Sequence, residues 1–272
     1  MPVSLDQIVA SARRKVADSK HVADLRELER RAHLHVPRGF RQTLEASRRK
    51  GTAIIAELKK ASPSRGLIRA NFNPRSLAAE LEAAGAAALS VLTDVEFFRG
   101  SLQNLQTASA STKLACLRKD FIVDEFQILE ARANGADAVL LIVAALSDGE
   151  LSRLAGAAGS HGLDALCEVH DEEELRRAVN AGCGLIGVNT RDLRTFKVDL
   201  QTAFRLADRI PDDALRIAES GIHSGADIAK LRDAGYQAFL IGESLMKAES
   251  PGQALRGLLA ESQSAQDVLR GK

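Results

Sequence analysis

The strongest constraint on the fold of this chain is a regular alternation of short apolar runs with longer segments of helical period. Eight runs rich in Val, Ile, Leu and Ala lie at 53–58, 87–92, 113–117, 137–143, 164–169, 184–189, 214–219 and 237–242. Segments of helical period lie between them, for example at 74–85, 124–135, 171–182 and 224–235. Strands that alternate with helices form a parallel sheet, because each helix carries the chain back across the sheet.

Glycine residues add an internal repeat to this alternation. Gly85, Gly135, Gly182 and Gly235 each stand between a helical segment and the next apolar run, roughly 50 residues apart. A glycine in this place ends a helix at positive φ before the chain turns into a strand. Eight unbroken units favour a closed (β/α)8 TIM barrel over an open doubly wound sheet. Such a sheet usually has about five or six strands and a G-x-G-x-x-G fingerprint, which this sequence lacks.

The first 50 residues differ from this pattern. Apolar residues on one helical face predict a helix near the start of the chain, namely Leu5, Ile8, Val9, Ala12 and Val16. A second helical pattern covers 24–32, and Pro37 and Gly39 end it. We therefore expect an α/β protein with a single domain overall, in which an N-terminal helical extension (1–50) packs on a (β/α)8 barrel (51–272).

Charge and cysteine content narrow the class of protein. The chain has 37 basic and 36 acidic side chains and a formal net charge of +1, which argues against a nucleic-acid binder held by phosphate contacts. It shows no secretory signal and no run of about 18 apolar residues, so we expect a cytoplasmic protein that contacts no membrane. Cys116, Cys167 and Cys183 form no C-x-x-C pair, and we expect reduced, buried thiols.

Polar side chains collect where the predicted strands end. In barrels the active site lies at the carboxyl ends of the strands. Six of the runs end in, or are followed by, such residues: Glu57 and Lys59, Arg118 to Asp120, Glu168, Asn189 and Arg191, Glu219 to Gly221, and Gly242 with Glu243. The sequence therefore places a candidate site at this end of the barrel.

Two of these carboxylates follow apolar residues and are expected to be partly withdrawn from water. Because an isolated buried charge is costly, Glu57 and Glu168 require nearby cations, and Lys59 and Lys119 stand at neighbouring strand ends. Two carboxylates that face two lysines can divide into acid and base roles. The structural alternative is an ion-pair network that only closes the top of the barrel.

Two further features suggest what this end of the barrel binds. The last two predicted strands end in Glu-Ser-Gly and Ile-Gly-Glu, and the loops at these places in barrels commonly bind phosphate through backbone N–H groups. Phe97, Phe98 and Phe121 lie near the same rim and can form walls for an apolar ring. His170 and His223 have no further ligands at metal-binding spacing, so we expect no metal.

Together these motifs resemble one family, indole-3-glycerol phosphate synthase, over almost the whole chain. They are IIAELKKASPSRG (54–66), SVLTDVEFFRGS (90–101), LRKDFIVDEFQI (117–128), ADAVLLIV (136–143), CEVH (167–170), IGVNTRDLRTF (186–196), IAESGI (217–222) and LIGESLM (240–246). One departure is Ala115-Cys116, where the family often has Pro and a β-branched residue. The resemblance implies a barrel enzyme of tryptophan biosynthesis, a carboxy-lyase without a cofactor. Its reaction closes 1-(2-carboxyphenylamino)-1-deoxyribulose 5-phosphate to indole-3-glycerol phosphate, with loss of carbon dioxide and water.

The resemblance also implies roles for individual residues. Lys119 resembles the acid that protonates the substrate carbonyl, and Lys59 resembles the cation that meets the anionic groups of the substrate and a candidate acid for dehydration. Glu57 and Glu168 resemble the carboxylates that stabilise the cationic intermediate and take a proton. The remaining positions match the substrate-binding set, Ser62, Phe98, Phe121, Leu140, Asn189 and Arg191, and the phosphate-binding set, Ser220, Gly221, Gly242 and Glu243. We expect a monomer or a weak homo-oligomer that binds a phosphorylated small molecule.

Three alternatives stay open from the sequence. A phosphoribosylanthranilate isomerase pairs one acid with one base and has no need for two lysines. A Schiff-base aldolase would use Lys119 as its nucleophile, and borohydride trapping would identify it. A barrel that binds without catalysing would normally have lost some of its charged strand ends, whereas all of them are present here.

Overall fold

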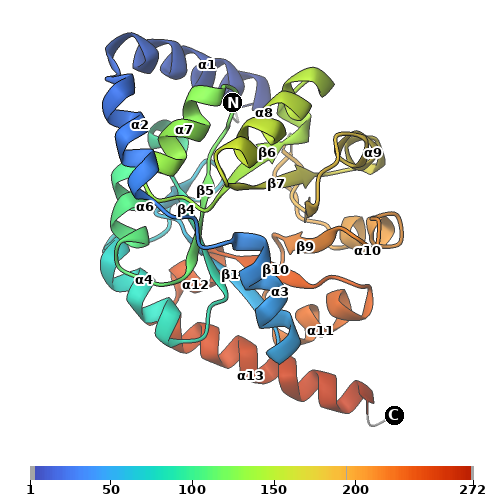
Figure 1. Cartoon of the computed structure of the whole chain (residues 1–272). Helices are drawn as coiled ribbons and strands as arrows, with labels where there is room; N and C mark the ends of the chain where they lie inside the picture. The colour runs from blue at the N-terminus through green and yellow to red at the C-terminus, as the bar shows by residue number, and fades with distance from the viewer. Residues whose placement is uncertain (1–3, 194, 271–272) are drawn as a thin grey trace.

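Eight parallel strands close into a barrel, and helices surround it (Figure 1). In this computed structural model the order around the barrel is β1-β10-β9-β8-β7-β6-β5-β4, and β1 also pairs with β4. The barrel strands are β1 (Ala53–Leu58), β4 (Ala88–Leu92), β5 (Ala115–Lys119), β6 (Ala138–Ile142), β7 (Asp164–Val169), β8 (Leu185–Asn189), β9 (Leu215–Glu219) and β10 (Ala238–Ile241). The described residues are 4–193 and 195–270. Residues 1–3, Arg194 of the 186–196 motif and the last two residues of the predicted barrel lie outside them.

Helices connect consecutive barrel strands. The main ones are α4 (Pro74–Ala83), α6 (Leu102–Ser109), α7 (Glu125–Ala133), α8 (Asp148–Ser160), α9 (Glu172–Asn180), α10 (Gln201–Ala207) and α11 (Gly225–Asp233), and the final helix α13 (Pro251–Arg270) follows the last strand. Shorter elements in the loops are the hairpin strands β2 (Ala61–Ser62) and β3 (Gly66–Leu67), α5 (Val95–Phe98), η1 (Val143–Ala145) and α12 (Glu243–Lys247). Among the described helices, none is both long and apolar enough to cross a membrane.

The barrel predicted from the sequence repeat is confirmed. Each of the eight apolar runs overlaps one barrel strand. Gly85, Gly135, Gly182 and Gly235 all have positive φ, so the repeat arises from helices that end in the same way. The largest shift is in the third run, where the strand extends to Lys119 and so includes this lysine.

Three helices precede the barrel: α1 (Leu5–Val22), α2 (Leu25–Leu34) and α3 (Phe40–Lys50). The first two cover the helical patterns noted in the sequence. The third was not predicted, because its few apolar side chains are spread among charged ones. Phe40 and Leu44 of α3 are fully buried, and the helix contacts β1, β4 and β5. The division of the chain at residue 50 stays a prediction.

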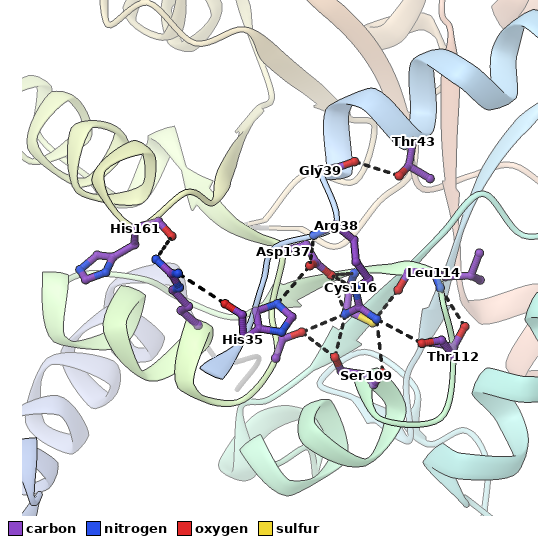
Figure 2. Close-up of polar contacts among 12 residues, drawn as sticks. His35, Arg38, Gly39, Thr43, Ser109, Thr112, Leu114, Cys116, Asp137 and His161 are labelled. Carbon is purple, nitrogen blue, oxygen red and sulfur yellow. Dashed lines mark hydrogen bonds and ion pairs between the residues drawn. The ribbon is translucent and has the colours of Figure 1, made fainter. Parts of the chain in front are cut away.

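A buried aspartate attaches the link between α2 and α3 to the barrel (Figure 2). Asp137 lies directly before β6, and its Oδ1 accepts from the backbone N–H of Arg38 at 2.7 Å and lies 3.1 Å from His35 Nε2. Its Oδ2 accepts from Arg38 Nε at 2.9 Å and from the backbone N–H of Cys116 at 2.6 Å. Burial raises the pKa of Asp137, but the contacts with His35 and Arg38 outweigh burial and lower this pKa below its usual value. The carboxylate is therefore ionised and paired at neutral pH.

Replacing Asp137 with Asn is expected to lower the free energy of unfolding by about 3 kcal/mol at pH 7, because Arg38 loses its buried charged partner. Since folding lowers the pKa of Asp137, its stabilisation is complete above the unfolded-state pKa of about 4 and is lost as the pH falls through the folded-state pKa. Urea unfolding of both proteins at pH 7 and at lower pH measures this difference, which should shrink in acid.

Asp212→Asn is the matched control, because Asp212 is a fully exposed partner of Arg216. Its effect on the free energy of unfolding should stay below about 0.5 kcal/mol. If Asp137→Asn changed stability at pH 7 no more than this control, the buried contact would not anchor the link between α2 and α3.

The expectation of three reduced thiols is wrong for two of them. Cys167 of β7 and Cys183, which precedes β8, form a disulfide with 6.3 Å between their Cα atoms. Because β7 and β8 are parallel neighbours, the crossover through α9 returns the chain beside the strand it left. The C-x-x-C criterion missed this pair because 16 positions separate the two cysteines. Cys116 is a free, buried thiol, as expected.

Candidate active site

The carboxyl ends of the barrel strands surround a cavity of about 150 Å³. Every residue given a catalytic or binding role from the sequence lines it: Glu57, Lys59, Ser62, Phe98, Lys119, Phe121, Leu140, Glu168, Asn189, Arg191, Ser220, Gly221, Gly242 and Glu243. Phe97, named there as a possible ring wall, does not line it. The barrel thus brings together residues from the first strand to the last. Their individual roles remain predictions.

Lys119, the last residue of β5, lies between two buried carboxylates. Its Nζ is 2.5 Å from Glu168 Oε2 and 3.0 Å from Glu219 Oε2. Burial lowers the pKa of Lys119, but the negative charges of Glu168, Glu219 and Glu57 outweigh burial and raise this pKa above its usual value. Burial raises the pKa of Glu168, but Lys119 and His170 hold it well below its usual range. Lys119 and Glu168 are therefore both charged at neutral pH.

Glu219, the last residue of β9, was named among the strand-end residues in the sequence analysis but was given no role there. It is 1% exposed, and no described residue donates a hydrogen bond to its Oε1. Burial raises the pKa of Glu219, Lys119 opposes this, and the nearby charges of Glu168 and Glu57 raise it further, to about 7. The sequence held a signal, because Glu219 ends an apolar run as Glu57 and Glu168 do. Its place beside the predicted phosphate residues left it without a role of its own.

A second lysine–carboxylate pair lies at the end of β1. Lys59 Nζ is 2.5 Å from Glu57 Oε2. Glycines on other strands and loops make room for these carboxylates, since a Cβ on Gly242 would lie 2.1 Å from Glu57 Oε2, and a Cβ on Gly187 would lie 2.1 Å from Glu219 Oε1. Gly242 was selected for phosphate binding, and its lack of a side chain also gives Glu57 its position.

Glu243, which lines the cavity together with Arg191, pairs with three cations. Its carboxylate oxygens lie 3.1 Å from Arg65 Nε, 3.3 Å from Arg191 Nη2 and 2.6 Å from Lys247 Nζ. Burial raises the pKa of Glu243, but Lys247, Arg65 and Arg191 outweigh burial and lower it. Three positive charges around one carboxylate leave this part of the wall with an excess of positive charge, which favours an anionic ligand.

Apolar side chains form another part of the wall. The ring centroids of Phe98 and Phe121 are 6.4 Å apart, and Leu140 is buried beside the cavity. Phe98 belongs to α5, whose first turn is capped by Asp94 through a 2.6 Å hydrogen bond from the backbone N–H of Phe97. Lys15 of α1 donates to the other oxygen of Asp94 at 2.9 Å. The N-terminal helix therefore contacts the element that carries this ring wall.

The remaining polar wall residues are held by backbone contacts. Asn189 Oδ1 accepts from the backbone N–H of Arg191 at 3.0 Å, and Arg191 Nη1 donates to the carbonyl of Phe196 at 3.3 Å. Ser62 lies in the hairpin of β2 and β3, paired with Gly66. Within the described part of the chain, no group of three or more His, Cys, Asp or Glu is placed to hold a metal ion.

Comparison of the sequence with known proteins finds one matching family model and a similar curated protein. The family model of indole-3-glycerol phosphate synthase matches residues 5–258. A curated indole-3-glycerol phosphate synthase from Koribacter versatilis (strain Ellin345) is 59% identical over 259 residues, which cover 95% of this chain and all of that protein.

Comparisons with solved structures concern the fold alone. A mandelate oxidase variant with a flavin adduct has a TM-score of 0.63 at 16% identity and covers 88% of this chain and 93% of its own. Thiamine phosphate pyrophosphorylase from Pyrococcus furiosus has a TM-score of 0.60 at 16% identity and covers 80% of this chain and 98% of its own. At such low identity these similarities support the barrel architecture and say nothing of the reaction.

Proposed function

The chain belongs to the indole-3-glycerol phosphate synthase family, and from this premise we propose how its cavity carries out the family's reaction. The protein is a decarboxylating lyase of tryptophan biosynthesis that acts on a phosphorylated small molecule. Its reaction converts 1-(2-carboxyphenylamino)-1-deoxyribulose 5-phosphate to indole-3-glycerol phosphate, carbon dioxide and water. The observation that carries the proposed roles is the contact of Lys119 with Glu168 and Glu219 inside the cavity.

Lys119 acts as the acid of ring closure. The ring carbon that bears the carboxylate attacks the ketone carbon, and the ketone oxygen gains negative charge. Such an oxygen is a far stronger base than Glu168 or Glu219, so it takes the proton that these carboxylates hold on Lys119 Nζ in the free site. The proton is thus released only as the carbon–carbon bond forms.

Glu168, Lys59 and Glu57 act on the charged groups of the substrate and of the intermediate that ring closure produces. Ring closure leaves positive charge on the nitrogen side of the intermediate, which the ionised Glu168 stabilises. Lys59 attracts the substrate carboxylate and then protonates the hydroxyl that leaves as water. Glu57, 2.5 Å from Lys59 Nζ, holds this ammonium in place.

Glu219 acts as the base of dehydration. Loss of water from the decarboxylated intermediate requires removal of a proton from the carbon next to the nitrogen. A carboxylate with a pKa of about 7 is a stronger base than an exposed one and is still ionised in a large fraction of molecules at neutral pH. Glu219 lines the cavity, and its Oε2 lies 3.0 Å from Lys119 Nζ, so this base stands beside the acid of ring closure.

The rest of the wall binds and orients the substrate. Phe98, Phe121 and Leu140 enclose the anthranilate ring, and Asn189, Arg191 and Ser62 orient its polar groups; all six line the cavity. Ser220, Gly221, Gly242 and Glu243 bind the phosphate, chiefly through backbone N–H groups. The excess positive charge of Arg65, Arg191 and Lys247 around Glu243 supports this placement.

Replacing Gly221 with Ala is expected to raise KM about tenfold and to change kcat less, because phosphate binding contributes mainly to substrate affinity. Gly221 has a φ of +72°, and a Cβ there would lie 2.6 Å from Val198 Cγ1, so the loop must shift. The KM for substrate and the inhibition constant of inorganic phosphate measure the effect.

Gly182→Ala is the control for backbone strain. Gly182 has a φ of +75°, and a Cβ there meets no described atom within 4 Å. Its variant should keep the parent KM and phosphate inhibition. Parent-like phosphate inhibition in Gly221→Ala would place the phosphate elsewhere.

Three further properties are part of the proposal. The enzyme works in the cytoplasm as a monomer or weak homo-oligomer and needs neither a metal nor a cofactor. A disulfide is unusual in that compartment, but Cys167 is fully buried and Cys183 is 9% exposed, which shields the bond from thiol reductants. Light scattering of the purified protein tests the oligomeric state.

Indole formation tests the proposed function. Purified protein mixed with the carboxyphenylamino substrate should produce indole fluorescence and release one carbon dioxide per indole. The isomerase alternative predicts no indole from this substrate but consumption of phosphoribosylanthranilate. The aldolase alternative predicts a covalent adduct on Lys119.

A further inference from the structure

A histidine lies behind Glu168, outside the wall of the cavity. His170 directly follows β7, and its Nε2 lies 3.4 Å from Glu168 Oε1. The other oxygen of Glu168, Oε2, lies 2.5 Å from Lys119 Nζ. A protonated His170 therefore places a second cation beside this carboxylate, on the oxygen that Lys119 does not contact.

Glu174, in the first turn of α9, fixes the imidazole on its other side. Its Oε2 accepts from the backbone N–H of His170 at 2.8 Å and lies 2.9 Å from His170 Nδ1. The side chain of His170 is 12% exposed, and no described residue forms an aligned hydrogen bond with its Nε2. The imidazole is thus held with its Nε2 near the carboxylate of Glu168.

The acid step assigned to Lys119 changes the surroundings of Glu168. When Lys119 has given its proton to the ketone oxygen, it is neutral, and the buried Glu168 loses an ionic partner. An unpaired buried charge is costly, and breaking a buried ion pair by removing one partner is strongly destabilising. We propose, on the basis of the function proposed above, that His170 is a positioning residue that keeps Glu168 ionised while Lys119 is neutral.

The charges around His170 keep it protonated. Burial lowers the pKa of His170, but the carboxylates of Glu168 and Glu174 outweigh burial and raise this pKa to about 10. Of the other elements packed against β7 and α9, η1 (Val-Ala-Ala), β6 (Ala-Val-Leu-Leu-Ile) and β8 (Leu-Ile-Gly-Val-Asn) carry no charge. Helix α8 carries three charged side chains, and each is paired elsewhere: Asp148 with Arg177, Glu150 with Arg13 and Arg153 with Glu125. The next cation, Lys119, lies on the far side of Glu168. The imidazolium is therefore present throughout the neutral range.

His170→Gln tests the need for this cation. Glutamine keeps a hydrogen-bond donor near the place of Nε2 but carries no charge. We expect kcat for indole formation at pH 7 to fall by about one to two orders of magnitude, with KM changed less than about threefold, because the charge is needed after Lys119 has acted. A kcat within about threefold of the parent value would overturn the proposal.

Glu174→Gln tests the need for the positive charge of His170 without replacing the histidine. Removing one of the two carboxylates lowers the pKa of His170, so the imidazole loses its proton at lower pH than in the parent. The ratio of variant to parent kcat is expected to fall about tenfold between pH 6.5 and 9. Glu173→Gln is the matched control, because Glu173 lies on the same helix and pairs with Arg176 in solvent; its ratio should stay constant with pH.

Either variant alone can overturn the proposal. If His170→Gln does not fold, the pH profile of Glu174→Gln decides, and a profile like that of Glu173→Gln overturns the proposal. The parent is measured in the same assay. An inactive parent would count against the proposed function, whereas an active parent with unaffected variants would count against the role of His170 alone.

Discussion

Replacing Lys119 with Met is expected to lower kcat by about 10²–10⁴-fold while the barrel stays folded, because a general acid contributes this much to a proton-transfer step. Methionine fills a similar volume but has no proton to give. Glu219, whose Oε2 lies 3.0 Å from Lys119 Nζ, would lose this cation, and its pKa would rise further, whereas Glu168 would keep His170 as a cation 3.4 Å away. The loss should appear in kcat more than in KM, since the proton moves only as the bond forms.

Steady-state kinetics of indole formation measure this effect. Lys113→Met is the control, because Lys113 precedes the same strand but is exposed; it should keep the parent kcat. Thermal melting of each variant separates a loss of catalysis from a loss of folding. A kcat for Lys119→Met within tenfold of the parent would exclude Lys119 as the acid.

Replacing Glu219 with Gln is expected to slow dehydration by about 10²–10³-fold and to leave ring closure and decarboxylation in place. Because the pKa of Glu219 is about 7 and the base form is the active one, kcat of the parent should fall as the pH drops below 7. The variant has no carboxylate to protonate at this position, so that limb of its profile should be absent.

Rapid quenching of one turnover distinguishes this role from others. In Glu219→Gln, carbon dioxide should appear before indole, because the decarboxylated intermediate accumulates. Simultaneous release of carbon dioxide and indole, or an unchanged acidic limb, would show that another group removes the proton.

The barrel could be predicted from the sequence because its signal is repeated. Each strand is a short apolar run, and Gly85, Gly135, Gly182 and Gly235 end their helices with positive φ. Because the same pattern recurs along the chain, each occurrence strengthens the prediction of the others. Helix α3 gave no such signal, since its core contribution comes from Phe40 and Leu44 alone among charged neighbours. Its place depends on the shape of the barrel, which no local pattern encodes.

The Cys167–Cys183 disulfide escaped prediction for a similar reason. Sequence spacing identifies cysteines that are close along the chain. These two are close only because parallel neighbours β7 and β8 are joined by a helix. The pairing follows from the register of the strands, and the register follows from the closed barrel.

Most of the candidate site could be predicted because polar residues at strand ends converge in any barrel. The sequence at a strand end does not show which other side chain the residue there will contact. The contact of Glu219 with Lys119 spans 100 positions, and the cations around Glu243 come from the loop after β1, the loop after β8 and α12. His170 was considered only as a metal ligand, because its contact with Glu174 depends on how α9 packs against β7.

The most direct test of the account is turnover in the presence of sodium cyanoborohydride, which reduces iminium ions in preference to ketones. Indole-3-glycerol phosphate and the intact mass of the protein are measured in the same sample. The account predicts that product forms at the normal rate and that the protein mass is unchanged, because Lys119 gives a proton and forms no covalent bond. Loss of product together with a mass increase located at Lys119 would contradict it.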